Sequence, residues 1–463
     1  MTAHWDLGEL ARAAGAEVRG GELPGAVQAV ATDTRSLPPA SLFVALRGER
    51  FDGHDFAAAA VAAGARALLV DREGDARCES LGAPRLVVQD TLRALGDLAS
   101  FVRRQHAGRV VAITGSNGKT TTKELVAAVL AAVSSVHKTI GNLNNLVGLP
   151  LTLLAWPNET RWAVVEMGMN HLGEIARLTE IATPDVGVIT NVAPAHLAGL
   201  GSVDAVARAK GELYAGLGAT ATAIVNADDP LVQGIAVPLL GQQKRLRFGW
   251  ARGADVRIER YVPTAQGSRV MLELEGAPVE LHLPLFGTHN AVNAAAAAAA
   301  AWALGVDRDV IASGMGNVRV PGGRLRVIAE TRRRIGVIDD TYNANPHSMH
   351  AAFAALAERG TGRRVAVLGD MLELGDSAAA LHREVGRSAA VAGLDWVVSF
   401  GELAEAVAEG ARRAGAEATV AASLEDLLAL LDRGLVAGDW VLVKGSRGMR
   451  MERVVDHLMA EGV

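Results

Sequence analysis

The sequence predicts an α/β protein of three domains, with a doubly wound parallel sheet in the middle and a Rossmann-like α/β domain at the C-terminus. The chain has 463 residues, half of them hydrophobic, which is too long for one ordinary core. From residue 109 onwards, short apolar runs alternate with helical patterns, which is typical of parallel sheets covered by helices. The alternation stops near residues 316–323 and then starts again. We therefore expect domains at residues 1–106, 107–318 and 319–463.

The first segment combines short strand patterns with alanine-rich helices and predicts a small α/β domain. Its strands are expected at residues 42–46, 67–70 and 85–88. A loop at residues 33–39 is rich in polar and turn-forming residues.

The second segment predicts the parallel sheet, followed by an antiparallel appendage at residues 255–285, where polar and apolar residues alternate. Helices are expected at residues 119–133 and 289–304. The buried strands are expected at residues 110–114, 162–165, 186–190 and 221–225.

The third segment repeats the strand–helix alternation on a smaller scale. Its strands are expected at residues 334–338, 364–368, 396–400, 419–421 and 440–443.

Charge and composition exclude several classes of protein. Lys and Arg total 46 against 51 Asp and Glu, so the net charge of −5 argues against a nucleic-acid binder. A single cysteine, Cys78, excludes an intrachain disulfide and a multi-cysteine zinc site. The longest apolar tract, residues 294–302, is far shorter than the roughly 20 residues that span a bilayer. The N-terminus also lacks the apolar run of a secretory signal. We expect a cytoplasmic protein without membrane insertion.

A glycine-rich turn between the strand at 110–114 and the helix that follows predicts a phosphate-binding loop. Glycines let the backbone curl around phosphate oxygens, a helix N-terminus offers free N–H groups, Lys119 supplies a charge, and Thr120 offers a hydroxyl to Mg²⁺. Ile113 stands where the general P-loop pattern has its first glycine, so the loop is a shortened form. An incidental glycine turn is the alternative interpretation. The predicted nucleotide-binding residues here are Thr114, Gly115, Ser116, Asn117, Gly118, Lys119, Thr120 and Thr121.

Glu166 ends the apolar strand at 162–165, and ligands gather at the carboxyl ends of strands in open α/β sheets. A carboxylate there can hold a hard divalent cation that bridges phosphates. A helix-capping or solvated glutamate is the alternative. His196 follows the strand at 186–190; imidazole is not the expected Mg²⁺ ligand, so its chemistry alone favours loop packing.

Lys210 falls in the middle of an apolar helical stripe. The stripe repeats at 3.6 residues, while Asp204, Arg208 and Glu212 form the opposite, solvated face. An unpaired lysine on such a stripe is costly unless it is neutralised or has a special role. The alternative is a lysine that reaches solvent from the edge of the stripe.

The stretch TGSNGKTTTKE resembles the loop of the Mur ligase and folylpolyglutamate synthase superfamily, and the similarity to Mur ligases covers nearly the whole chain. The resemblance implies an ATP-dependent ligase that joins a carboxylate to an amine through an acyl phosphate. It implies a UDP-binding N-terminal domain, a central ATPase domain, and two Mg²⁺ held by Thr120, Glu166, His196 and Lys210. It also implies that Lys210 is carbamylated in the active enzyme.

The resemblance also implies two small-molecule substrates, a UDP-muramoyl-tripeptide and D-alanyl-D-alanine, and we expect a monomer. The stretch DDTYNANP, followed by Ser348 and Met349, favours the dipeptide over other amines. By resemblance Asn290 lies against the adenine, Arg324 faces the γ-phosphate and Asp340 the ribose. The residues expected at the substrates are Thr34, Arg35, Ser36, Asn144, Asn145, Asn345 and Lys444.

Two rival functions remain open. A folylpolyglutamate synthase would perform the same chemistry on another substrate, and the long segment before the phosphate loop argues against it. A regulatory P-loop NTPase would need no second substrate. A dehydrogenase is disfavoured because no G-x-G-x-x-G motif opens either sheet.

Overall fold

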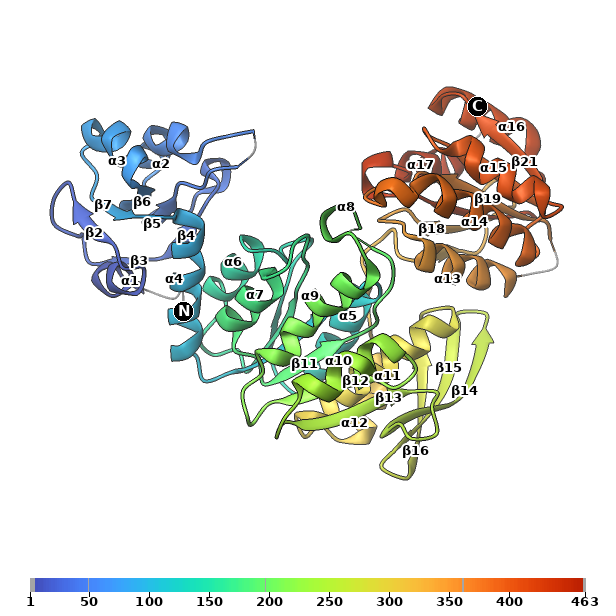
Figure 1. The fold of residues 1–463 in the computed structure, drawn as a ribbon, viewed down its shortest axis with the longest axis horizontal. Coiled ribbons are helices and arrows are strands. Elements are labelled where there is room, and N and C mark those ends of the chain that lie inside the picture. The colour runs from blue at the N-terminus through green and yellow to red at the C-terminus, as the bar shows by residue number, and fades with distance from the viewer. Residues whose placement is uncertain (1–4, 49, 196, 360–361, 461–463) are drawn as a thin grey trace.

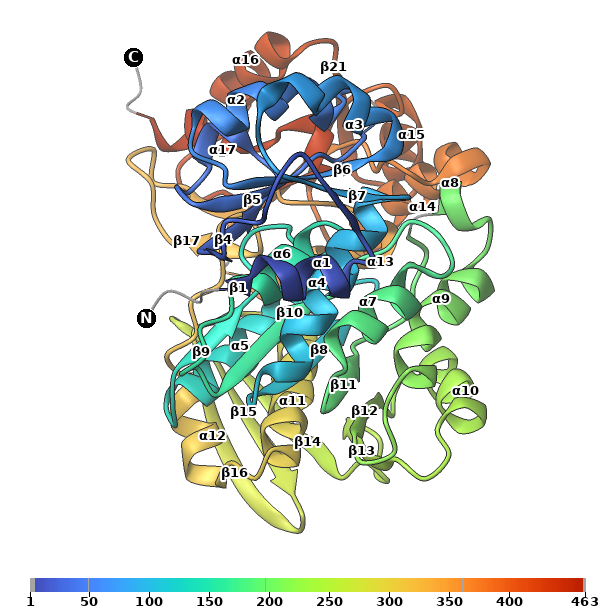
Figure 2. The same cartoon turned by 90° about the vertical axis from the view of Figure 1, so that its left-hand side faces the viewer.

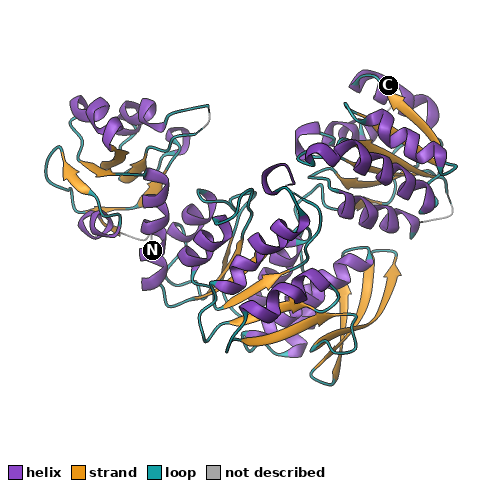
Figure 3. Ribbon diagram, in the orientation of Figure 1, coloured by secondary structure: helices purple, strands orange, loops and turns teal. Residues whose placement is uncertain are grey.

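The computed structural model describes residues 5–48, 50–195, 197–359 and 362–460. Figure 1 shows three α/β units in a row, with the N-terminal unit at one end, the C-terminal unit at the other and the largest sheet between them. Figure 2 views the same arrangement from the N-terminal side. Helices and strands are interleaved in all three units (Figure 3). None of the helices described is long and apolar enough to cross a membrane.

The N-terminal unit is a five-stranded sheet in the order β2-β7-β6-β5-β4, beside a short β1–β3 pair. Strand β7 occupies the four residues that the sequence predicts, and β5 begins one residue earlier and ends two earlier than expected. The strands are β1 (Trp5–Asp6), β2 (Glu17–Arg19), β3 (Ala26–Val27), β4 (Ala29–Ala31), β5 (Ser41–Val44), β6 (Ala67–Asp71) and β7 (Arg85–Val88). The helices are α1 (Leu7–Ala13), α2 (Ala57–Ala62), α3 (Arg72–Cys78) and α4 (Thr91–Gln105).

The central unit is a nine-stranded sheet in the order β16-β15-β14-β13-β12-β11-β8-β10-β9. Its strands are β8 (Arg109–Thr114), β9 (Val136–Lys138), β10 (Trp162–Glu166), β11 (Val186–Ile189), β12 (Thr222–Asn226), β13 (Lys244–Gly249), β14 (Val256–Thr264), β15 (Gly267–Leu274) and β16 (Ala277–Leu283). Its helices are α5 (Lys119–Ala131), α6 (Gly148–Leu154), α7 (Glu174–Ala182), α8 (Leu197–Leu200), α9 (Val203–Ala215), α10 (Pro230–Leu239), α11 (Thr288–Ala303) and α12 (Arg308–Met315).

Strand β8 shows why this sheet is covered on both faces. Val110 and Ala112 point into a core formed with α4, α6, α7, α9 and α10. Val111 and Ile113 point into a second core formed with α5, α11 and α12. Because successive side chains of a strand alternate between faces, a continuous apolar run requires both faces to be buried. The doubly wound parallel sheet predicted from the sequence is confirmed.

The antiparallel appendage is part of this sheet and not separate from it. Strands β14, β15 and β16 are antiparallel to one another, as expected. However, β14 also pairs in parallel with β13, a strand that the sequence analysis missed. In β13 only Leu246, Phe248 and Gly249 are buried, so charged residues obscure the strand pattern.

The C-terminal unit is a six-stranded sheet in the order β17-β18-β22-β19-β20-β21, parallel except for the edge strand β17. Helices α13, α14 and α15 cover one face, and α16 and α17 cover the other. The strands are β17 (Arg326–Ile328), β18 (Gly336–Asp340), β19 (Arg364–Gly369), β20 (Trp396–Phe400), β21 (Glu417–Ala421) and β22 (Trp440–Lys444). The helices are α13 (Pro346–Ala357), α14 (Ala378–Val391), α15 (Ala404–Arg413), α16 (Leu424–Gly434) and α17 (Glu452–Met459).

Replacing Gly386 with alanine is expected to destabilise the protein. Helices α14 and α15 cross so closely here that a Cβ on Gly386 would lie 1.9 Å from the Val407 carbonyl oxygen. Overpacking of this kind costs about 1–3 kcal/mol. Gly234, in α10, has no neighbouring atom within 4 Å of such a Cβ. There the same substitution is expected to stabilise by up to about 1 kcal/mol, because alanine favours the helix. The melting temperature measured by thermal denaturation should therefore fall for Gly386→Ala and rise for Gly234→Ala. Equal shifts in the two variants would contradict the packing described.

Candidate active site

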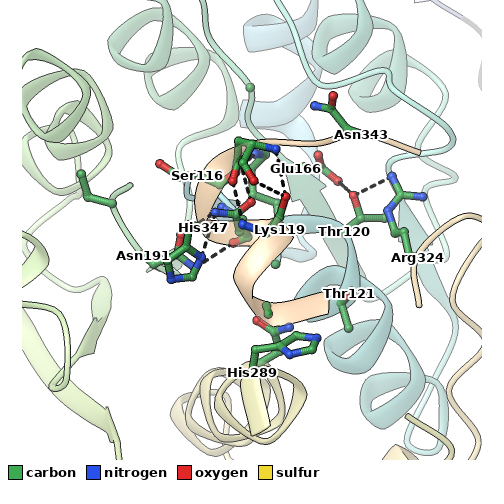
Figure 4. Close-up of a pocket in the computed structure, with 18 of the residues that line it drawn as sticks. Ser116, Lys119, Thr120, Thr121, Glu166, Asn191, His289, Arg324, Asn343 and His347 are labelled. Atoms are coloured by element: carbon green, nitrogen blue, oxygen red, sulfur yellow. Dashed lines mark hydrogen bonds between the residues drawn. The ribbon is translucent and has the colours of Figure 1, made fainter. Parts of the chain in front are cut away.

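A cleft of about 1320 Å³ lies between the central and C-terminal units, at the carboxyl ends of the strands of the central sheet. Residues far apart in the chain line it, from the phosphate loop at 116–121 to Lys444 at the end of β22. Figure 4 shows Thr120 between Glu166, from the central unit, and Arg324, from the C-terminal unit. The cleft therefore brings together residues that the sequence analysis singled out in two separate segments.

The phosphate loop has the backbone geometry that its glycines allow. Gly115 and Gly118 adopt φ angles of +152° and +80°, which L side chains rarely adopt. Gly118 is also the N-cap of α5, and a Cβ there would lie 2.3 Å from Asn293 Oδ1. A larger residue at position 118 is therefore disfavoured both by the backbone conformation and by the close approach of Asn293.

Lys119 folds back over this loop. Its Nζ donates to the carbonyl oxygens of Gly115 at 2.7 Å and Ser116 at 3.4 Å. Burial lowers the pKa of Lys119; Glu166 opposes this shift and Arg324 adds to it. The ammonium thus lies at the anion-binding end of α5, where free N–H groups also point.

Glu166 is the last residue of β10 and is almost fully buried, at 4% exposure. Its two carboxylate oxygens accept hydrogen bonds from Thr120 Oγ1 at 2.7 Å and Asn144 Nδ2 at 2.9 Å. A buried carboxylate beside a hydroxyl presents oxygen donors that fit a hard divalent cation. In the described part of the chain no cluster of three or more His, Cys, Asp and Glu side chains could hold a metal without other ligands.

Lys210 lies in α9 with only 2% of its surface exposed. Burial lowers its pKa well below the ordinary value, and the nearby charge of Lys119 adds to the shift. Among the residues described, none accepts a hydrogen bond from its Nζ or forms an ion pair with it. The prediction that this lysine lies within the apolar stripe, and not at its edge, is confirmed.

His196, another predicted metal ligand, lies outside the described residues.

Asp204 and Arg208 of α9 are exposed, as predicted for the solvated face of this helix. Glu212 differs, because its carboxylate accepts hydrogen bonds from the backbone N–H groups of Gly173 at 2.7 Å and Ala176 at 2.9 Å. It therefore caps the first turn of α7.

The C-terminal unit contributes Arg324, whose Nη2 donates to Thr120 Oγ1 at 3.2 Å and whose guanidinium lies 3.6 Å above the Tyr342 ring. Two glycines, Gly322 and Gly323, precede Arg324. A Cβ on the second, Gly323, would lie 3.0 Å from the backbone nitrogen of Tyr342, whereas Gly322 has no neighbour within 4 Å. Gly323 is therefore the glycine that the turn requires, and Arg324 still reaches the phosphate loop.

Asp340 and Lys444 form a buried pair at the ends of two neighbouring strands, with Nζ 2.5 Å from Oδ2. Lys444 also donates to the carbonyl oxygen of Asn343 at 2.9 Å. Asn345 caps α13 and donates to Asn117 of the phosphate loop at 2.8 Å. All three predicted residues thus line the cleft.

The remaining predicted residues divide between the cleft and a distant loop. Asn144, Asn145 and Asn290 line the cleft. Thr34, Arg35 and Ser36 form a short 3₁₀ turn in the N-terminal unit, away from the cleft, and Arg35 forms an exposed ion pair with Asp33.

Several residues of the cleft were not predicted from the sequence. Asn191 fixes the loop, because its backbone oxygen accepts from the Ser116 N–H and its side-chain oxygen accepts from the Asn117 N–H, both at 2.9 Å. His289 also lines the cleft, and burial lowers its pKa to about 4, so the imidazole is neutral at pH 7. His347 Nδ1 lies 3.3 Å from Asn117 Nδ2. A position directly after a strand could have indicated Asn191, but nothing in the sequence indicates the two histidines.

Comparison with known proteins identifies the family. Residues 26–103 match the Mur ligase family catalytic domain, residues 113–301 the Mur ligase middle domain, and residues 323–447 the Mur ligase glutamate ligase domain. The chain belongs to the Mur ligase family. It is 43% identical over 453 residues to the UDP-N-acetylmuramoyl-tripeptide--D-alanyl-D-alanine ligase of Escherichia coli (strain K12), covering 96% of this chain and 97% of that protein. A protein of the same name from Bacillus subtilis (strain 168) is 39% identical over 94% of this chain and 93% of its own.

Solved structures agree with this Mur ligase fold over the whole chain. Crystal structure I of MurF from Acinetobacter baumannii has a TM-score of 0.91 and 35% identity, and covers 99% of this chain and 100% of its own. MurF ligase from Thermotoga maritima, in complex with ADP, has a TM-score of 0.83 and 30% identity, with 93% and 97% covered. The fold class predicted from the sequence is confirmed.

Proposed function

We propose that this Mur ligase joins D-alanyl-D-alanine to the terminal carboxylate of UDP-N-acetylmuramoyl-tripeptide, with formation of ADP and phosphate, in the cytoplasmic synthesis of peptidoglycan precursors. The observation that carries the proposal is the meeting of the phosphate loop with DDTYNANP across one cleft, through the Asn117–Asn345 hydrogen bond. The similarity to D-alanyl-D-alanine ligases over more than nine-tenths of the chain supports the same substrates.

ATP would bind with its phosphates on residues 114–121. The free N–H groups at the start of α5 and the Lys119 ammonium would neutralise phosphate charge. Arg324 would contact the γ-phosphate, a role supported by its 3.2 Å contact with Thr120. Asp340 would accept from the ribose, and Asn290 would lie against the adenine.

Thr120, Glu166, His196 and a carbamylated Lys210 would hold two Mg²⁺, which would neutralise charge on the transferring phosphoryl group. The donor set supports this for Thr120 and Glu166, which are already within hydrogen-bond distance of each other. The burial of Lys210 supports its modification, because a neutral amine can add CO₂.

The UDP-muramoyl-tripeptide would bind between the N-terminal and central units. Thr34, Arg35 and Ser36 would contact the UDP part, and Asn144 and Asn145 the muramoyl part. Asn345 and Lys444 would lie near the incoming dipeptide. The same proposal includes a monomeric state and three domains, at residues 1–106, 107–318 and 319–463.

In the reaction, the tripeptide carboxylate would attack the γ-phosphorus of ATP, giving an acyl phosphate and ADP. The dipeptide amine would then attack the acyl carbon, and phosphate would leave from the tetrahedral intermediate. The residues of the cleft would act mainly by positioning and by neutralising charge. Contact between the C-terminal unit and the phosphate loop would exclude water, which would otherwise hydrolyse the acyl phosphate.

Phosphate release separates this function from that of a regulatory NTPase. A ligase is expected to release phosphate with ATP, UDP-muramoyl-tripeptide and D-alanyl-D-alanine together, and only slowly when the dipeptide is omitted. A colorimetric phosphate assay measures the difference. Release at the same rate without the dipeptide would contradict the proposal.

A further inference from the structure

Helix α13 (Pro346–Ala357) of the C-terminal unit contacts the central unit at both of its ends. At its N-terminal end, Asn345 donates to Asn117 Oδ1 at 2.8 Å, and the amide of Asn117 faces His347 Nδ1 at 3.3 Å. This end therefore rests on the phosphate loop. In Figure 1 the helix lies between the C-terminal sheet and the β14–β15 end of the central sheet.

The C-terminal end of α13 reaches a different part of the central unit. Glu358, the C-cap of the helix, accepts a hydrogen bond from the Tyr261 hydroxyl at 2.8 Å. The same hydroxyl accepts from the Gly287 N–H at 2.8 Å. Gly287 directly precedes α11, adopts a φ of +87°, and has no room for a Cβ, which would lie 2.5 Å from the His289 ring. A chain of two hydrogen bonds thus joins the C-terminal unit to the start of α11.

Arg359 makes a second contact beside the first. Its guanidinium lies 3.6 Å above the Phe286 ring, and the residue is 8% exposed. Its Nε and Nη2 have no hydrogen-bond partner among the residues described, and the guanidinium makes a cation–π contact with the Phe286 ring. The carbonyl oxygen of Phe286 in turn accepts from Asn290 Nδ2 at 2.8 Å. Arg359 therefore packs against Phe286, the residue whose carbonyl oxygen holds the Asn290 side chain.

We infer that the C-terminal end of α13 positions the segment Phe286-Gly287-Thr288-His289-Asn290 for the base of the nucleotide. Tyr261, Glu358 and Arg359 are positioning residues, since they act through Phe286 and Gly287. The inference rests on the proposed function, which puts adenine against Asn290. Together with the Asn345–Asn117 contact, it makes α13 a single helix that holds the two ends of the nucleotide site in register.

The Tyr261 hydroxyl is the group on which this arrangement depends. Without it, the buried Gly287 N–H loses its acceptor and Glu358 loses its donor, while the ring still fills its place. The loss of such a buried hydrogen bond corresponds to about a tenfold change in an equilibrium constant. For Tyr261→Phe we expect KM for ATP to rise about tenfold. We expect kcat and the KM values for UDP-muramoyl-tripeptide and D-alanyl-D-alanine to stay near wild type, because the phosphate loop is untouched.

The test measures ADP binding by titration calorimetry on the full-length protein and its variants. Tyr261→Phe is expected to raise the Kd for ADP about tenfold, and Glu358→Ala to raise it several-fold. The double variant should bind no more weakly than Tyr261→Phe, because both substitutions break one chain of contacts. Glu358→Gln keeps an acceptor for the hydroxyl and serves as the matched control, with a Kd near wild type.

Three outcomes would overturn the inference: wild-type affinity in Glu358→Ala, losses that multiply in the double variant, or an equal rise in KM for all three substrates. The last would indicate a general structural role for Tyr261. Failure of the proposed function would look different from failure of this inference, because the wild-type protein itself would then not bind ADP.

Discussion

Replacing Lys119 with alanine is expected to abolish ligation while leaving the fold intact. The ammonium lies over the phosphate loop, where it donates to the carbonyl oxygens of Gly115 and Ser116. Removing one preorganised charge from the site of a transferring group costs about 10²–10³-fold in kcat or more. No apolar core depends on the side chain, so the far-ultraviolet circular dichroism spectrum and the melting temperature should change little.

The matched control is Lys244→Ala, which removes an exposed lysine from β13. This variant is expected to retain wild-type turnover. Dipeptide-dependent phosphate release at the wild-type rate in Lys119→Ala would overturn the phosphate-loop assignment. Loss of activity in both variants would indicate a nonspecific effect of charge.

The second large effect is expected at Lys210, which we predict is carbamylated in the active enzyme. Because burial lowers its pKa, the amine is neutral at a pH where free lysine is an ammonium ion. A neutral amine adds CO₂ and becomes an anionic N-carboxylate, releasing a proton. That product is an oxygen ligand that fits Mg²⁺, which an ammonium ion cannot be.

Lys210→Ala is therefore expected to lose about 10²–10³-fold in kcat, and a short carboxylic acid such as acetate or propionate should restore part of the rate. Arg208→Ala, on the exposed side of the same helix, is the control and should behave as wild type. Labelling with ¹³C-bicarbonate should give a carbamate signal in wild type that is absent from Lys210→Ala. Full activity in Lys210→Ala, or an unmodified amine in the active enzyme, would show that the prediction is wrong.

Much of the fold could be predicted because its buried strands are continuous apolar runs. Strand β20, with four buried residues and one partly buried, occupies the five residues that its sequence predicts. Strand β18 begins two residues later than expected, because Arg334 adopts a left-handed conformation with a φ of +60°. It also continues into Asp339 and Asp340, whose carboxylates are paired with neighbouring groups although they are buried. Paired acids in a core strand cannot be recognised from a hydrophobic pattern.

Short edge strands escaped prediction for a related reason. Strands β9 and β17 are three residues long and only partly buried, so they carry little hydrophobic signal. Their position depends on pairing with β10 and β18, which is a property of the folded sheet.

The site could be predicted where a motif links residue type to position. The phosphate loop follows strand β8 and Glu166 ends strand β10, and both line the cleft as expected. His347 could not be predicted, since it acts through a contact with Asn117 that only the tertiary fold creates. The Tyr261–Glu358 hydrogen bond could not be predicted either, because the two residues are 97 positions apart in the chain.

Product analysis by mass spectrometry tests the ligase assignment most directly. The protein is incubated with ATP, Mg²⁺, D-alanyl-D-alanine and UDP-muramoyl-tripeptides that carry either diaminopimelate or lysine at the third position. We expect a product heavier than one of the tripeptides by the dipeptide less one water, with one ADP and one phosphate formed for each molecule of product. Hydrolysis of ATP without any such product from either tripeptide would contradict the assignment.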